Sequence, residues 1–128
     1  MPENVKSSDA PLICIVDDDA SIADSTRYLV RVFGFRAEAF SSAEEFLNSS
    51  LVEKTKCLIL DVRMPGMDGL ELQRYLAQAD KRIQIVFVTA QANESERGQA
   101  MAEGAVDFLR KPFSEEALFA AIQAAVNR

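Results

Sequence analysis

The stretch CLILDVRMPGMDG at residues 57–69 decides the fold, because a short apolar run ends there at an aspartate and a turn follows. Every position from 57 to 60 is apolar, which is typical of a strand buried on both faces of a parallel sheet. Pro65 and Gly66 predict a loop, and Asp68 is a candidate N-cap for a helix after it. The stretch therefore predicts one strand, one loop and one helix in that order.

The same alternation recurs on both sides of this stretch. Further strands are predicted at residues 12–16, 35–40, 83–88 and 106–109, each followed by a segment of helical period. Strands that alternate with helices form a parallel sheet covered on both faces, and right-handed crossovers leave few topologies open. We therefore expect an α/β domain of five βα units, with a flavodoxin-like, doubly wound sheet of strand order 2-1-3-4-5.

Several helix boundaries carry local signals. Asn93 is expected to cap the fourth helix, and Gly104 to end it. The sequence SAEE at residues 42–45 predicts a capping box at the start of a short helix that runs through Leu51. The inward face of the third helix is expected to carry Leu72, Tyr75, Leu76 and Ala79.

The composition limits the classes of function. The 128 residues fit one domain, expected at residues 11–128 after a flexible tail at residues 1–10. The net charge of −6 argues against direct binding of nucleic acid or an anionic membrane. No apolar run can span a membrane and no signal peptide is evident, so we expect a cytoplasmic protein with Cys14 and Cys57 as free thiols. The lack of histidine excludes histidine-based catalysis.

Polar side chains stand where the strong strands end. They are three consecutive acids, a single acid, a hydroxyl and an amine: Asp17, Asp18, Asp19, Asp61, Thr89 and Lys111. Ligands of doubly wound sheets bind beyond the carboxyl ends of the strands, so we expect these side chains to share one edge. Asp19 is left open between this cluster and a simple helix cap.

The cluster suits phosphoryl chemistry. Neighbouring carboxylates repel one another unless a cation joins them, and an all-oxygen set suits Mg²⁺, with Mn²⁺ as a substitute. A carboxylate beside Mg²⁺ can attack phosphorus and form an aspartyl phosphate. We expect Asp61 to be that nucleophile, because it stands alone after the central strand, and Asp17 and Asp18 to be the metal-binding pair. Lys111 and Thr89 would bind phosphoryl oxygens.

Four motifs resemble the receiver domains of two-component response regulators. They are IVDDD at 15–19, LDVRMPGMDG at 60–69, VTA at 88–90 and AVDFLRKPF at 105–113, within a resemblance that covers residues 12–127. The resemblance implies that Asp61 is the phosphoacceptor of a domain that catalyses only its own phosphorylation and dephosphorylation. It also implies that Asp18 binds Mg²⁺ directly, that Asp17 acts mainly through water, and that the backbone carbonyl of Arg63 is another ligand. The Lys111–Pro112 peptide bond is expected to be cis.

The same resemblance implies a switch. Phe108 occupies the switch aromatic position, and its ring would move inward as Thr89 engages the phosphate, which remodels the surface of the fourth helix, fifth strand and fifth helix. Arg63 and Gln91 stand two residues after the phosphoacceptor and the switch threonine, and their side chains would tune the rate of hydrolysis.

Partners follow from the resemblance as well. The phosphodonor would be a sensor histidine kinase, and phosphorylation would favour a homodimer. Residues 60–73 are most similar to receivers joined to a LuxR-type (NarL/FixJ-like) DNA-binding domain, although residues 91–103 depart from the His-Gly-Asp sequence of that subgroup. Such a domain is absent from this chain, so a transcription factor and a stand-alone regulator both stay open.

Two rival functions also stay open. A haloacid-dehalogenase-type phosphatase would use Asp17 in a D-x-D motif, but it leaves Asp61 without a role and needs room for a substrate cap. A pseudo-receiver would bind partners without being phosphorylated. Singly, Asp61 as a turn residue, Lys111 as a surface lysine and Phe108 as a core residue are ordinary. Their convergence on one edge is what favours the receiver.

Overall fold

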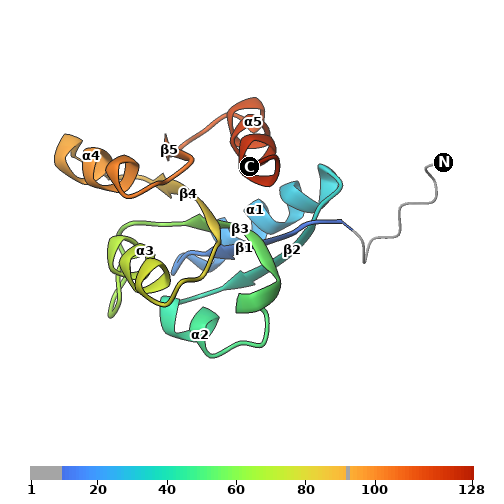
Figure 1. The fold of residues 1–128 in the computed structure, drawn as a ribbon. Coiled ribbons are helices and arrows are strands. Elements are labelled where there is room, and N and C mark those ends of the chain that lie inside the picture. Colours follow the sequence, from blue (N-terminus) through green and yellow to red (C-terminus); the bar gives the residue numbers. More distant parts are fainter. Residues whose placement is uncertain (1–9, 92) are drawn as a thin grey trace.

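The computed structural model describes residues 10–91 and 93–128, so nearly all of the tail expected at residues 1–10 lies outside the described residues. Five parallel strands form one sheet of order β2-β1-β3-β4-β5, as predicted (Figure 1). The strands are β1 (Leu12–Val16), β2 (Arg36–Phe40), β3 (Thr55–Leu60), β4 (Gln84–Thr89) and β5 (Asp107–Arg110). The helices are α1 (Ala20–Val32), α2 (Ala43–Leu47), the 3₁₀ turn η3 (Val52–Lys54), α3 (Gly69–Gln78), α4 (Glu94–Ala102) and α5 (Glu115–Val126).

Helices cover both faces of the sheet, with α1 and α5 on one side and α2 and α3 on the other (Figure 1). Alternate residues of β1 supply the two cores: Ile13 and Ile15 pack with α1 and α5, whereas Cys14 and Val16 pack with α2 and α3. All five residues of β1 are buried, which explains why its sequence is apolar without alternation. β1 is therefore enclosed by helices along its whole length.

The helix signals are confirmed at α4 and only in part at α2. Asn93 caps α4 in a full capping box with Glu96, and Gly104 follows that helix with a φ of 103°. Ser42 is the N-cap of α2, and its hydroxyl accepts a hydrogen bond from the Glu45 amide. The Glu45 carboxylate accepts from the Ser41 amide and not from the Ser42 amide, so the capping box is incomplete. The helix that was expected to continue through Leu51 ends at Leu47.

The face of α3 also differs from the prediction. Leu72 and Leu76 are buried, but Tyr75 is 48% exposed and Ala79 is the exposed C-cap, so their assignment to the core was wrong. Gln73 is buried instead, because this side of α3 packs against α4 and the Gln73 amide donates to the Ala100 carbonyl at 3.0 Å. A purely apolar criterion misses a buried amide with a backbone partner.

Among the described residues, no helix combines the length and the apolar character that a membrane crossing requires.

Candidate functional site

The acidic residues lie at the ends of two paired central strands. β1 and β3 run in register with Val16 opposite Leu60, so the residue after each strand emerges at the same edge of the sheet. The Asp61 amide donates to the Val16 carbonyl at 3.1 Å, and the Asp17 amide donates to the Phe40 carbonyl at 3.1 Å. These backbone bonds extend the ladder past the strands, so both carboxylates start from fixed positions.

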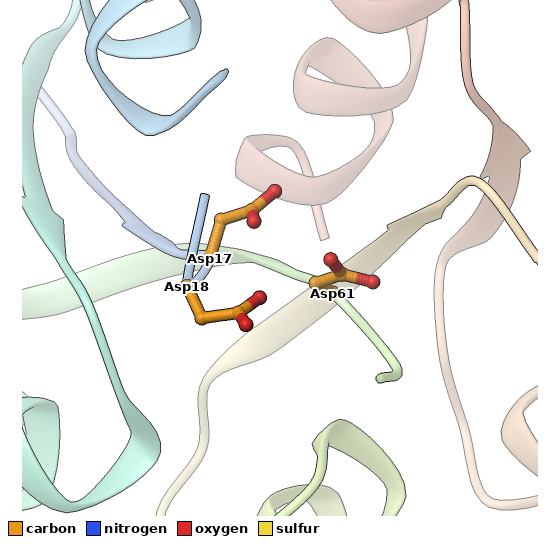
Figure 2. Close-up of side chains that lie close together, drawn as sticks. All are labelled: Asp17, Asp18 and Asp61. Atoms are coloured by element: carbon orange, nitrogen blue, oxygen red, sulfur yellow. The ribbon is translucent and has the colours of Figure 1, made fainter. Parts of the chain in front are cut away.

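Three carboxylates converge at this edge. Asp17, Asp18 and Asp61 each offer one oxygen, and these oxygens lie within 4.8 Å of one another (Figure 2). Asp17 and Asp61 are buried, at 1% and 7% exposure, whereas Asp18 is exposed and opens the cluster to solvent. Hard oxygen donors, clustered and reachable from solvent, fit a divalent cation such as Mg²⁺.

Lys111 joins the cluster from the end of β5. Its Nζ donates to Asp17 Oδ2 at 2.7 Å and to Asp61 Oδ2 at 3.2 Å, and its side chain is 11% exposed. Burial by itself lowers the pKa of Lys111, but the hydrogen bond to Asp17 and the charges of Asp61 and Asp17 outweigh it, so the pKa is raised. Lys111 is therefore a fixed cation, and its bond to Pro112 is cis, as expected.

The carboxyl group of Asp61 carries an electrostatic penalty. Burial raises its pKa, and the neighbouring negative charge of Asp17 raises it further. The charge of Lys111 and the Arg63 amide, which donates to Asp61 Oδ1 at 3.3 Å, lower the pKa without cancelling that rise. A divalent cation in the cluster would relieve the penalty, so the donor set and its charge both fit a bound metal.

Asp19 belongs to the helix and not to the cluster. Its carboxylate caps α1 by accepting hydrogen bonds from the Ser21 and Ile22 amides at 3.1 and 3.2 Å. The hydroxyl of Ser21 also donates to it, and that bond is the main reason that the pKa of Asp19 is lowered. The choice between cap and cluster is thus resolved in favour of the cap.

The proposed switch residues have other contacts in this conformation. The Thr89 hydroxyl donates to the Gln91 carbonyl at 2.9 Å and accepts from the Gln91 amide at 3.3 Å. The Phe108 ring is partly buried and packs against Phe87 with ring centroids 5.7 Å apart. Thr89 is therefore engaged with its own loop, and the Gln91 side chain is exposed.

Two residues that shape the site, Gly69 and Glu44, are not marked by the strand and helix periodicity of the sequence. A Cβ at Gly69 would overlap the Asp61 carbonyl oxygen, so this position requires glycine for the close approach of α3 to the loop that follows β3. Glu44 of α2 accepts a hydrogen bond from the Met67 amide at 3.0 Å and thereby anchors the same loop. The Asp-Gly pair at residues 68–69 is the one sequence signal that could have marked the first of them.

A comparison with known protein families identifies the family of this chain. The model of the response regulator receiver domain matches residues 13–123. The chain belongs to this family. A receiver domain is a signalling module and not a conventional enzyme, and the match favours this interpretation over the haloacid-dehalogenase alternative.

Similar proteins agree with the receiver assignment. The response regulator protein TodT of Pseudomonas putida is 44% identical over 121 residues, which are 94% of this chain and 53% of TodT. The transcriptional regulatory protein FixJ of Bradyrhizobium diazoefficiens is 36% identical over 116 residues, 91% of this chain and 57% of FixJ. The chain thus spans about half the length of the curated relatives it matches.

Solved structures show the same fold. The response regulator StyR superimposes with a TM-score of 0.85 at 43% identity, over 92% of this chain and 60% of StyR. The FixJ-N crystal structure gives a TM-score of 0.83 at 32% identity, over 92% of this chain and 94% of FixJ-N.

Proposed function

We propose that this receiver domain accepts a phosphoryl group on Asp61 and transmits the change to the surface formed by α4, β5 and α5. The observation that carries the proposal is the contact of one partly buried lysine, Lys111, with two carboxylates at the carboxyl edge of the sheet. Asp61 is the acceptor because it follows the central strand and borders the exposed Asp18, whereas Asp17 is enclosed.

The transfer is a substitution at phosphorus. An oxygen of Asp61 forms a bond to the phosphorus atom as the bond to the donor breaks, and the donor leaves with the electron pair. Lys111 stands next to Asp61 Oδ2 and would bind a phosphoryl oxygen, which places a fixed positive charge where negative charge gathers. Catalysis consists of positioning and charge neutralisation.

The metal set is part of the proposal. Asp18 and Asp61 would hold Mg²⁺ directly, Asp17 mainly through water, and the Arg63 backbone carbonyl would complete the protein ligands. Mg²⁺, or Mn²⁺ in its place, supplies positive charge to the phosphoryl oxygens. Arg63 and Gln91 border the site and would tune how fast water removes the phosphoryl group.

The switch requires a change of partner at Thr89. Its hydroxyl would leave the Gln91 carbonyl and donate to a phosphoryl oxygen, and the loop between β4 and α4 would follow. Phe108 would then move inward from its packing on Phe87, which alters the face of β5 next to α4.

The partners are inferred from the family. The donor would be the phosphohistidine of a sensor histidine kinase in the cytoplasm. The output would be transcription through a LuxR-type DNA-binding domain outside this chain, because similar proteins that include FixJ are named transcriptional regulatory proteins. Phosphorylation would favour a homodimer through the α4–β5 face.

Intact-mass spectrometry tests the phosphoacceptor. We expect incubation with acetyl phosphate and Mg²⁺ to add one phosphoryl group to the wild type and to Asp24→Asn, a matched change at an exposed site on α1, but not to Asp61→Asn. A phosphorylated histidine kinase serves as a second donor, since a receiver can refuse small donors.

The phosphatase and the pseudo-receiver alternatives predict different masses in this experiment. A gain that survives Asp61→Asn and is lost in Asp17→Asn would support the phosphatase. No gain from either donor would identify a pseudo-receiver.

A further inference from the structure

Arg63 touches both the phosphoacceptor and α4. Its backbone amide donates to Asp61 Oδ1 at 3.3 Å, and its guanidinium donates from Nη2 to Glu96 Oε1 at 2.8 Å. Glu96 lies in the first turn of α4, 33 residues further along the chain. One residue of the β3–α3 loop thus joins the site of chemistry to a helix of the proposed output face.

The acceptor oxygen of this ion pair also belongs to the helix cap. Glu96 Oε1 accepts the Asn93 amide at 3.3 Å, while the Asn93 side chain accepts the Glu96 amide at 2.8 Å. Arg63 therefore binds the carboxylate that completes the α4 capping box, and not a free surface acid. The Glu96 side chain is 19% exposed, whereas the Arg63 side chain is 52% exposed, so one partner of the pair lies open to solvent.

The ion pair matters because α4 has few other attachments. Ala100 is the one buried residue among the nine of α4, and Gly98 weakens the helix interior. Helix α3 contacts α4 through the hydrogen bond from the Gln73 amide to the Ala100 carbonyl, and Gln73 Oε1 is buried without a partner among the described residues. The Arg63–Glu96 ion pair is therefore one of the few polar contacts between α4 and the rest of the domain.

We propose that the Arg63–Glu96 ion pair is a tie between the phosphoacceptor loop and α4 that phosphorylation of Asp61 releases. The proposal rests on the function proposed above. Phosphorylation replaces the Asp61 carboxylate with an acyl phosphate that carries about one to two negative charges on its phosphoryl oxygens, and a guanidinium binds phosphate oxygens in a bidentate manner. Arg63 would exchange the Glu96 carboxylate for the phosphoryl group, and α4 would lose its connection to the loop. Glu96 is a positioning residue that acts through Arg63.

The tie is tested first without any phosphoryl group or metal. Glu96→Gln keeps an oxygen for the capping box and removes the charge, and Arg63→Gln removes the other partner. We expect amide hydrogen exchange at residues 97–103 to quicken about two- to fivefold in either variant, and no further in the double variant. Glu94→Gln is the matched control, an equal charge change at an exposed acid in the same helical turn.

The release is tested by repeating the exchange on phosphorylated protein, with occupancy measured by intact mass. We expect phosphorylation to quicken exchange in α4 of the wild type and of Glu94→Gln, and to add a smaller increment in Glu96→Gln and Arg63→Gln. Equal behaviour of Glu96→Gln and Glu94→Gln in both states would overturn the tie. If phosphorylation quickened α4 exchange in Glu96→Gln and Arg63→Gln as much as in the wild type, the release alone would be overturned. If the wild type gained no phosphoryl mass, the proposed function and the release would be overturned together.

Discussion

The central strands and α4 are held in opposite ways. All five residues of β1 are buried, and so are five of the six in β3, so these strands bury apolar side chains on both faces of the sheet. In α4, one residue of nine is buried, and the contacts that fix it include an ion pair and a side-chain amide. The most enclosed elements carry Asp17 and Asp61, and the most exposed helix lies at the proposed output face.

The contrast between buried strands and an exposed helix matches the different physical requirements of phosphoryl transfer and of a switch. Phosphoryl transfer needs carboxylates and an ammonium held in one geometry, and backbone ladders between buried strands supply that rigidity. A switch needs an element whose two positions differ little in free energy, and a helix with little buried apolar area meets that need. Unfolding and hydrogen-exchange measurements test whether rigidity and mobility are divided in this way.

The largest effect is expected from removing apolar contacts in the rigid region. Leu58→Ala in β3 should lower the free energy of unfolding by about 3 kcal/mol, because it leaves a cavity among fully buried side chains. Met101→Ala in α4 should lower it by about 1 kcal/mol or less, because Met101 is only partly buried and its surroundings can relax. Urea unfolding measures both. Equal losses would mean that α4 is as firmly packed as the sheet.

A smaller effect is expected from the buried charge at the edge of the sheet. Without metal, Asp61→Asn should raise the free energy of unfolding at pH 7 by roughly 1 kcal/mol, because it removes a carboxylate that burial and Asp17 disfavour. The folded-state pKa of Asp61 lies above its unfolded value of about 3.9, so the penalty is full above the folded pKa. It should fade as the pH drops through that pKa toward about 4.

Two measurements check this sign. The difference in urea midpoint between Asp61→Asn and wild type should shrink from pH 7 to pH 4, and a constant difference would contradict the electrostatic cause. Mg²⁺ at pH 7 should stabilise the wild type more than the variant, since the variant lacks one of the three clustered carboxylates.

Much of this division could be predicted from the sequence. The apolar runs that end at Asp17 and Asp61 indicate buried parallel strands, and parallel strands place their carboxyl ends on one edge, so the cluster follows from the fold class. Lys111 joins it for the same reason, at the end of β5. Periodicity and strand order suffice here, because the backbone alone brings these residues together.

The attachments of α4 could not be predicted in this way. Glu96 forms a capping box with Asn93, which local sequence can indicate, but its bond to Arg63 depends on how a loop and a helix 33 residues apart pack. The burial of Gln73 likewise depends on the Ala100 carbonyl of another helix. Side-chain contacts between elements have no period in the sequence, so the attachments of the more exposed α4 are the less predictable part.

The smallest effect is expected from Gly98→Ala, which makes α4 a better helix. A Cβ at Gly98 meets no atom within 4 Å, so the change should raise the free energy of unfolding by about 0.5–1 kcal/mol through backbone entropy alone. Gly104→Ala is the matched control, because it also has open space but a φ of 103°, so alanine there should destabilise.

Hydrogen exchange locates the effect of Gly98→Ala. If α4 is weak because its helix is poorly supported, exchange should slow within α4 and stay unchanged in β1 and β3, and phosphorylation should quicken α4 less than in the wild type. A gain in global stability without slower exchange in α4 would place the weakness elsewhere, in the contacts of the helix with α3 and the loop. The stability of α4 would then depend on those contacts, which include the ion pair of Arg63 with Glu96, and not on backbone entropy.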